Sequence, residues 1–291
     1  KQKDWARAIE ELRRDEHIAL DLLLELKKMA RSTFYYHLKH FSTEDNYKDV
    51  KDKISAIFHK HKGRYGYRRV TLELRKELPD INHKTVKKLM DELGLKCEVR
   101  RVKYRSYKGD VGKTAPNIVD RDFSADRPYQ KLTTDVTQIN IGNSKVFLSP
   151  ILDMFDGEIL TYVISESPNL KMVMDMLNKL YEKINIPKGM LIHSDQGWHY
   201  QHIAYQKSLK NHDIVQSMSR KGNCLDNSMM ENFFGIMKSE LLYANKYSSM
   251  DQFLKDLEEY MDYYNNDRIK LRLNGMSPVQ YREAYQASLN V

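Results

Sequence analysis

The chain has 291 residues, of which 41% are hydrophobic, and this is enough for a hydrophobic core and for more than one domain. Its 48 Lys and Arg residues outnumber its 40 Asp and Glu residues, and the net charge of +8 favours a polyanionic partner. The composition excludes a disordered chain, and the sequence shows neither a signal-peptide pattern nor an apolar run of membrane-spanning length, so we expect a soluble intracellular protein.

The first hundred residues predict helices joined by short connections. A Leu-rich helix is expected over residues 18–29, and a second short helix follows, with Ser32 or Thr33 as its N-cap. This pair is either a plain helical hairpin or a DNA-reading helix-turn-helix, and the sequence leaves both interpretations open. Residues 1–45 form this predicted N-terminal helical segment.

A second helix-turn-helix is predicted for residues 46–95. The segment HKGRYGYRRVTLELRKEL contains a Gly turn and then a helix that Pro79 stops. Asn82 is the predicted N-cap of the next helix, whose apolar stripe ends before Gly94. We interpret this unit as the DNA-binding domain, with these candidate DNA contacts: Arg64, Tyr65, Arg68, Arg69, Lys84, Lys87 and Lys88.

Basic residues gather between Lys96 and Lys113, interleaved with Tyr104 and Tyr107. This mixture suits a solvated linker as well as a strap that follows phosphates and stacks on bases. Residues 96–128 are therefore a predicted basic linker, which ends in a proline-bracketed polar loop. Its candidate DNA contacts are Arg100, Arg101, Lys103 and Arg105.

The hydrophobic period changes after residue 128 and predicts an α/β domain. Three β-rich runs, KLTTDVTQINI, VFLSPILDMF and EILTYVIS, predict an antiparallel meander. Helices and strands then alternate: a helix over 169–183, the strand GMLIHS, a helix over 200–211, the strand DIVQSM and a long helix through SMMENFFGIMKSELLY. The predicted core covers residues 129–248, and a C-terminal helical segment covers 249–291.

Three acidic residues stand out against this layout. Asp135 lies in the middle of the first predicted strand, where Asp is disfavoured. Asp195 follows the fourth strand in LIHSDQGWHY, where Asp and Gly also suit an ordinary turn. Glu231 lies on the last helix, with thirty-five residues between it and Asp195. The other nearby acids, which are interpreted as turn or helix-cap residues, are Asp153, Asp156 and Asp226.

The motifs TTDVT, HSDQG and ENFFGIMK resemble the catalytic core of DDE transposases and retroviral integrases, which share a ribonuclease H-like fold. The segments HKGRYGYRRV, SRKGNCLDNSMMENFFG and YNNDRIKLRLNGMSPVQY resemble bacterial insertion-sequence transposases made by frameshifting between two overlapping reading frames, as the second-frame product. The resemblance covers nearly the whole chain. It departs at Ile269 and Lys270, where the family usually has Pro-His after the Arg.

The resemblance implies an α/β ribonuclease H-like (integrase) core with a mixed five-stranded sheet, preceded by an all-α helix-turn-helix region. It implies that Asp135, Asp195 and Glu231 hold two Mg²⁺ ions per active site, with Mn²⁺ as a substitute. Phosphoryl transfer with two metal ions needs such carboxylates, because they hold both ions and leave positions for water and for the attacking and leaving oxygens. Further candidate DNA contacts are Trp198, Asn223 and Lys238.

The family further implies a transposase that cleaves a strand at the element's ends and joins the 3′-hydroxyl to DNA by transesterification. The expected partners are double-stranded DNA (terminal inverted repeats and target), further copies of the chain, and a first-frame helix-turn-helix and coiled-coil region fused at the N-terminus. No membrane is expected, and the expected location is the bacterial cytoplasm, at the nucleoid. Two alternatives are a ribonuclease H-like nuclease or resolvase without strand transfer and a DNA-binding regulator with an inactive core. The helix-turn-helix units argue against the first, and the intact acids argue against the second.

Overall fold

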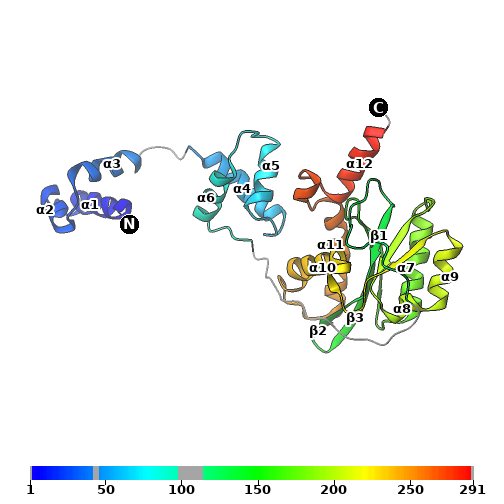
Figure 1. The fold of residues 1–291 in the computed structure, drawn as a ribbon. Coiled ribbons are helices and arrows are strands. Elements are labelled where there is room, and N and C mark those ends of the chain that lie inside the picture. The colour runs from blue at the N-terminus through cyan, green and yellow to red at the C-terminus, as the bar shows by residue number, and fades with distance from the viewer. Residues whose placement is uncertain (1, 42–45, 98–113, 290–291) are drawn as a thin grey trace.

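The computed structural model describes residues 2–41, 46–97 and 114–289, and its ribbon is drawn in Figure 1. The N-terminal unit consists of α1 (Gln2–Asp15), α2 (Leu20–Lys27) and α3 (Arg31–Phe41) around a small apolar core. The predicted N-cap at Ser32 or Thr33 is wrong, because α3 begins at Arg31. The amide of Phe34 already donates to the carbonyl of Ala30 at 3.1 Å, so both residues lie inside the first turn.

The next unit consists of α4 (Lys48–Lys60), α5 (Tyr67–Arg75) and α6 (His83–Glu92). The side chain of Asn82 accepts a hydrogen bond from the amide of Lys84 at 2.9 Å, which confirms the predicted N-cap of α6. The helix ends two residues before Gly94, whose φ of +68° explains why glycine stands there. Ile54, Val70, Leu74, Val86 and Leu89 are buried together between the three helices.

The mixed sheet that the sequence predicts is present. Its strands are β1 (Lys131–Thr134), β2 (Thr137–Ile141), β3 (Ser144–Asp153), β4 (Ile159–Ser165), β5 (Leu191–Ser194) and β6 (Val215–Met218). The sheet order is β2-β3-β1-β5-β6, with β4 on the other side of β3. The pairs β1–β5 and β5–β6 are parallel, and the pairs that β3 makes are antiparallel. Six strands replace the expected five because the first predicted strand is split.

The split lies at Asp135 and Val136. The strands β1 and β2 pair with β3 in one continuous register, from Thr134↔Ile151 to Thr137↔Leu148, so Asp135 falls opposite Pro150. Proline has no N–H to donate to a ladder. Asp135 therefore follows the end of β1, and its predicted position in the middle of a strand is wrong.

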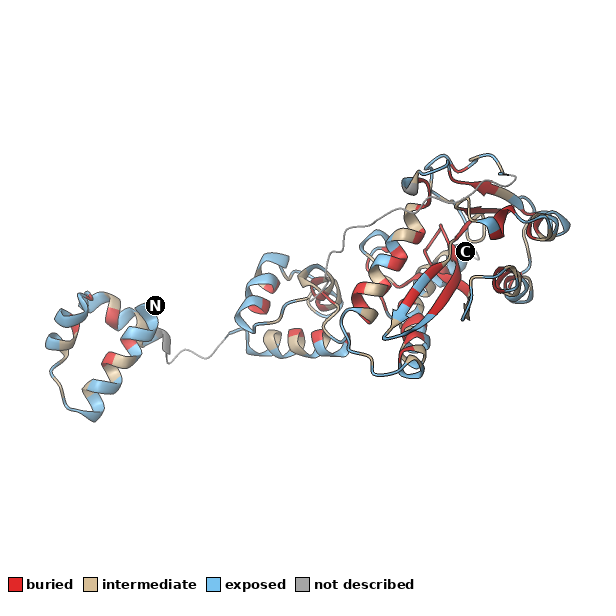
Figure 2. Ribbon diagram, turned by 90° about the horizontal axis from the view of Figure 1, so that it is seen from below, coloured by how far each residue is buried: buried red, intermediate tan, exposed pale blue. Residues whose placement is uncertain are grey.

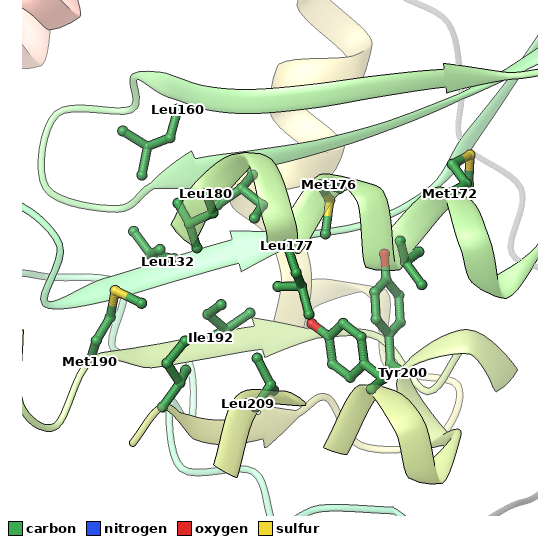
Figure 3. Close-up of a cluster of buried hydrophobic side chains, with 14 of the residues drawn as sticks. Leu132, Leu160, Met172, Met176, Leu177, Leu180, Met190, Ile192, Tyr200 and Leu209 are labelled. Atoms are coloured by element: carbon green, nitrogen blue, oxygen red, sulfur yellow. The ribbon is translucent and has the colours of Figure 1, made fainter. Parts of the chain in front are cut away.

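Helices cover both faces of the sheet (Figure 1). On one face, α7 (Leu170–Lys183), α8 (Trp198–Gln201) and α9 (Ile203–Asn211) bury an apolar cluster, in which Figure 3 shows Leu177 of α7 beside Ile192 of β5. The single helix expected over 200–211 is two helices, because the side chain of His202 accepts from the amide of Ala204 at 3.1 Å and starts α9 anew. On the other face, α10 (Ser228–Met237) and α11 (Met250–Asn266) form the second cluster.

A short 3-10 helix, η1 (Cys224–Asn227), precedes α10, and a π-helical turn, η2 (Lys238–Leu242), follows it directly. After α11 come the 3-10 helix η3 (Leu271–Leu273) and α12 (Pro278–Leu289). The last part of the predicted linker lies on the core, since Val119 and Phe123 pack with Met154 and Leu191. Burial is concentrated in the sheet, and the N-terminal unit is largely exposed (Figure 2). No helix in the described ranges is long and apolar enough to span a membrane.

Candidate active site

Asp135 and Asp195 lie side by side at one end of the sheet. The parallel strands β1 and β5 pair Lys131 with Leu191 and Thr133 with His193, and this register continued by two residues brings Asp135 level with Asp195. Both residues directly follow the carboxyl ends of their strands, where open α/β sheets bind ligands. Each side chain remains partly exposed.

Glu231 reaches the same place from α10, and Asn227 fixes the start of that helix to β1. The hydroxyl of Thr133 donates to Oδ1 of Asn227 at 2.5 Å, and Nδ2 of Asn227 donates to the carbonyl of Thr134 at 3.2 Å. Glu231 follows four residues later, about one helical turn from this anchor. The two hydrogen bonds of Asn227 therefore hold the start of α10, and with it Glu231, next to Thr134, the residue before Asp135.

The three carboxylates interact electrostatically. Desolvation raises the pKa of Asp135 well above its ordinary range, and the charges of Asp195 and Glu231 raise it further, while Lys238 opposes them. Desolvation also raises the pKa of Asp195, against a hydrogen bond from the amide of Gly197. The negative charges of these carboxylates repel one another, and a bound cation would reduce this repulsion.

Lys238, at the first turn of η2, is a positive charge beside these carboxylates. Its Nζ donates to Oγ1 of Thr137 at 2.8 Å, and its charge acts on Asp135. Desolvation lowers the pKa of this amine, and Asp135 raises it. Lys238 is therefore at the carboxylate site, on the turn that directly continues the helix of Glu231.

The residues present fit a hard divalent cation by their chemistry, because three carboxylates offer only oxygen donors and repel one another. In the described ranges, no group of three or more His, Cys, Asp or Glu side chains lies in an arrangement that could hold a metal ion. Asp135, Asp195 and Glu231 are electrostatic neighbours, and their oxygen donors suit a divalent cation by their chemistry.

Gly197 supports Asp195 at close range. Its amide donates to Oδ1 of Asp195 at 2.8 Å, and a Cβ at this position would lie 2.9 Å from that same oxygen and 3.3 Å from the ring of Tyr200. The φ of −58° is allowed for any residue, so only the lack of space requires glycine here.

We expect Gly197→Ala to fold and to lower the DNA cleavage that the family resemblance implies by about 10- to 100-fold, because displacing a reacting group by about 1 Å costs on that order. Circular dichroism and the rate of nicking of labelled DNA measure the two quantities. Gly235→Ala is the matched control, since a Cβ there meets open space. Nicking by Gly197→Ala at the wild-type rate would show that cleavage does not depend on the place that Gly197 gives the carboxylate of Asp195.

The alternative acids have structural partners. Asp226 is buried and accepts hydrogen bonds from Arg220, Arg121 and Asn117, and the guanidinium of Arg220 is the largest cause of its lowered pKa. Its predicted role as a helix cap is wrong, because no side chain caps η1 or α10. Asp226 instead anchors the loop that leads to Asn227.

Asp153 and Asp156 belong to a buried cluster at the far end of β3. Arg282 of α12 donates to Asp153 at 2.9 Å and to Asp156 at 2.7 Å, and it lies 2.7 Å from Glu158. Burial raises the pKa of Asp153 to about 7, Asp156 adds to this, and Arg282 opposes it. These acids neutralise an arginine and do not join the carboxylate site.

The candidate DNA contacts separate into exposed and buried groups. Arg68, Lys84, Lys87 and Lys88 are exposed, as is Trp198 beside Asp195, and Asn223 is half-buried. The assignment of Tyr65 as a DNA contact is wrong, because its exposed fraction is 0% and its hydroxyl is bonded within the protein.

Two further candidates are partly enclosed. Arg69 lies 3.7 Å from Glu240, and Arg64 lies over the ring of Tyr263. Arg100, Arg101, Lys103 and Arg105 lie outside the described residues.

Sequence reasoning missed two residues of the site. Tyr200 is fully buried, its pKa is raised by desolvation and then by Asp135 and Asp195, and its hydroxyl lies 3.4 Å from Oγ1 of Thr134. A polar residue four positions before Glu231 was a usable signal for Asn227, whereas Tyr200 looks like any core aromatic in the sequence.

Comparisons with known proteins identify relatives along the chain. Residues 125–224 and 231–285 match family models of the integrase core domain, and residues 44–103 match a helix-turn-helix-like domain. The InsK protein of insertion sequence element IS150 from Escherichia coli is 50% identical over 90% of this chain and 93% of its own length. The transposase of insertion sequence element IS904 from Lactococcus lactis is 32% identical over 80% of this chain and 93% of its own.

Among solved structures, the magnesium-bound integrase catalytic core of HTLV-2 is similar at a TM-score of 0.42 and 16% identity, covering 54% of this chain and 97% of that one.

Proposed function

Because the chain belongs to the DDE transposases of bacterial insertion sequences, we propose that it cleaves a DNA strand at the ends of its element and joins the resulting 3′-hydroxyl to DNA. The observation that carries this proposal is the meeting of Asp135 and Asp195 at the ends of two parallel strands, with Glu231 coupled to them from α10. The reaction is a hydrolysis followed by a direct transesterification, without a covalent enzyme intermediate.

Each residue of the site has a part in this chemistry. Asp135, Asp195 and Glu231 would hold two Mg²⁺ ions, or Mn²⁺ in their place, which when bound polarise phosphoryl oxygens and lower the pKa of water. Lys238 would donate to a phosphate oxygen beside Asp135, which its existing bond to Thr137 supports. Asn227 would hold the helix of Glu231 in place through β1.

Double-stranded DNA, as terminal inverted repeat and as target, is the proposed partner. The exposed lysines of α6 would contact phosphates together with Arg68, and the partly exposed Arg64 and Arg69 would lie at the edge of that surface. Trp198 would stack on an unpaired base next to the site, with Asn223 beside it. The DNA backbone between the α6 surface and the carboxylate site would be contacted by Arg100, Arg101, Lys103 and Arg105.

The family resemblance supports three further parts of the proposal. The chain would act as a homo-oligomer on DNA, and it would follow a first-frame helix-turn-helix and coiled-coil region as a fusion. It would work in the bacterial cytoplasm, at the nucleoid. Sedimentation of the protein with and without element-end DNA measures the first of these.

Incubation of the protein with labelled element-end DNA and Mg²⁺ tests the function. We expect nicks at the element's end and joined products that carry its 3′ strand. Nicks without joined products would favour the nuclease or resolvase alternative. Binding without nicks would favour a DNA-binding regulator.

The lysines of α6 make a separate prediction about DNA binding. Lys84, Lys87 and Lys88 lie on one exposed face of the helix. Replacing all three with Gln should weaken end binding and flatten its salt dependence by about one log-log unit per lost phosphate contact. Fluorescence anisotropy over a salt series measures the slope. The charge-matched control changes the exposed Lys188, Lys207 and Lys210, and an unchanged slope in the α6 variant would move the DNA grip elsewhere.

A further inference from the structure

The unit of α4 to α6 is joined to the catalytic core by buried polar contacts. Tyr65 is fully buried, and its hydroxyl donates to the carbonyl of Asp267 at 2.9 Å and accepts from the amide of Ile269 at 3.0 Å. Its ring stacks on His61 with centroids 3.8 Å apart. Leu72 of α5 also approaches Gly275 so closely that a Cβ there would lie 3.3 Å from it.

A buried carboxylate forms the other half of this contact. Glu240 accepts from Nε and Nη2 of Arg268 at 2.8 and 2.7 Å and from the hydroxyl of Tyr260 at 3.0 Å. Arg69, on α5, lies 3.7 Å from the same carboxylate. We call the set of Tyr65, Arg69, Glu240 and Arg268 the Tyr65 joint.

The joint is continuous with the catalytic helix. Glu240 lies on η2, two residues after Lys238, and η2 follows α10 without a break. Single π-helical turns within α-helices are frequent at functional sites. The joint therefore connects the segment that carries Glu231 and Lys238 to the segment that carries the DNA-binding lysines. The C-terminal signature around Arg268, which the metal site leaves unexplained, is one of its parts.

We propose that the Tyr65 joint is a positioning element, which holds the DNA-binding face of α6 at a fixed place relative to the carboxylate site of the same chain. The inference rests on the proposed function. If the α4–α6 unit were flexibly connected, bound DNA would reach the carboxylate site only at a limited effective concentration. A fixed connection holds the bound DNA in the orientation that the reaction needs. Tyr65, Arg69, Glu240 and Arg268 are positioning residues in this sense and do not contact the reacting atoms.

Tyr65→Phe in the full chain tests the proposal, because it removes one oxygen and keeps the buried ring. Losing both hydrogen bonds of the hydroxyl weakens the joint by about tenfold or more. We expect the Kd for element-end DNA to stay at the wild-type value and the single-turnover cleavage rate to fall by about tenfold. The amide of Ile269, which donates to the lost oxygen, should exchange its hydrogen faster.

Tyr243→Phe is the matched control, since it makes the same change on an exposed tyrosine just after η2. A thermal melt verifies that both variants fold. Wild-type cleavage by Tyr65→Phe together with faster exchange at Ile269 would overturn the joint as a positioning element. Equal losses of binding and cleavage would also overturn it, because they would make Tyr65 part of the DNA grip. Failure of the proposed function is distinct, since the wild-type protein itself would then not cleave.

Discussion

Glu231→Gln is expected to lower both strand cleavage and strand joining by several orders of magnitude, while DNA-end binding persists. The substitution keeps the size of the side chain and removes the charge that acts on Asp135. Because one site serves both steps, the two rates should fall together. Removing one of several clustered negative charges should leave the fold intact or slightly stabilise the metal-free protein. Labelled-DNA assays, anisotropy and thermal melting measure these three outcomes.

Glu182→Gln is the control for this experiment, because it makes the same change at an exposed position of α7. Nicking by Glu231→Gln near the wild-type rate in Mg²⁺ would remove Glu231 from the ligand set. Loss of joining with intact cleavage would contradict a single shared site.

Arg282→Met is expected to destabilise the fold by about 3–5 kcal/mol, the usual range when one partner of a buried ion pair is removed. The substitution leaves Asp153, Asp156 and Glu158 in place without the guanidinium that contacts all three. Urea unfolding measures the loss. Arg127→Met, at an exposed position, is the control and should change stability by less than about 0.5 kcal/mol. If Arg282→Met also lost less than about 0.5 kcal/mol of stability, the three acids would have to be neutralised by other groups.

The free energy of unfolding of Arg282→Met should also depend on pH, because Asp153 has a raised pKa. Its pKa in the folded chain is about 7 against an ordinary value of 3.8, so between these values the folded state binds a proton that the unfolded state does not. Stability therefore rises as the pH falls from about 7 toward 4. Arg282 lowers this pKa, so its removal should enlarge the effect. The part of the Arg282→Met deficit that comes from Asp153 should therefore grow as the pH rises above about 7 and should be smaller and nearly constant between about pH 5 and 6.

Local signals in the sequence predicted much of the fold. Asn82 and Asn169 were readable as helix starts, and each side chain caps its helix as that reading requires. The alternation of strands and helices predicted the mixed sheet. The split of the first strand was not predictable from the strand itself, because it depends on Pro150 in a different strand and on the register between them.

The candidate site shows the same limit. Spacing and resemblance indicated Asp135, Asp195 and Glu231 as a set, but not the tether of Asn227 to Thr133 or the support of Asp195 by Gly197, which depend on contacts between distant segments. Tyr65 was misassigned for a related reason. An aromatic residue among arginines favours nucleic-acid contact when it is exposed, and burial against residues 267–269, about two hundred positions away, is invisible in the local sequence.

The ion pairs of Arg282 with Asp153, Asp156 and Glu158 affect the order in which the protein folds during synthesis. The end of β3 and the turn between β3 and β4, which carry Asp153, Asp156 and Glu158, leave the ribosome well before α12, and chains of this size fold domain by domain as they emerge. Until α12 arrives, closing the sheet would bury Asp153 and Asp156 without the guanidinium of Arg282 that pairs with both. The helices α4 to α6 have a core made mostly of their own residues and can form first. We therefore expect a nascent chain to form the α4–α6 unit before the sheet and its helices are complete.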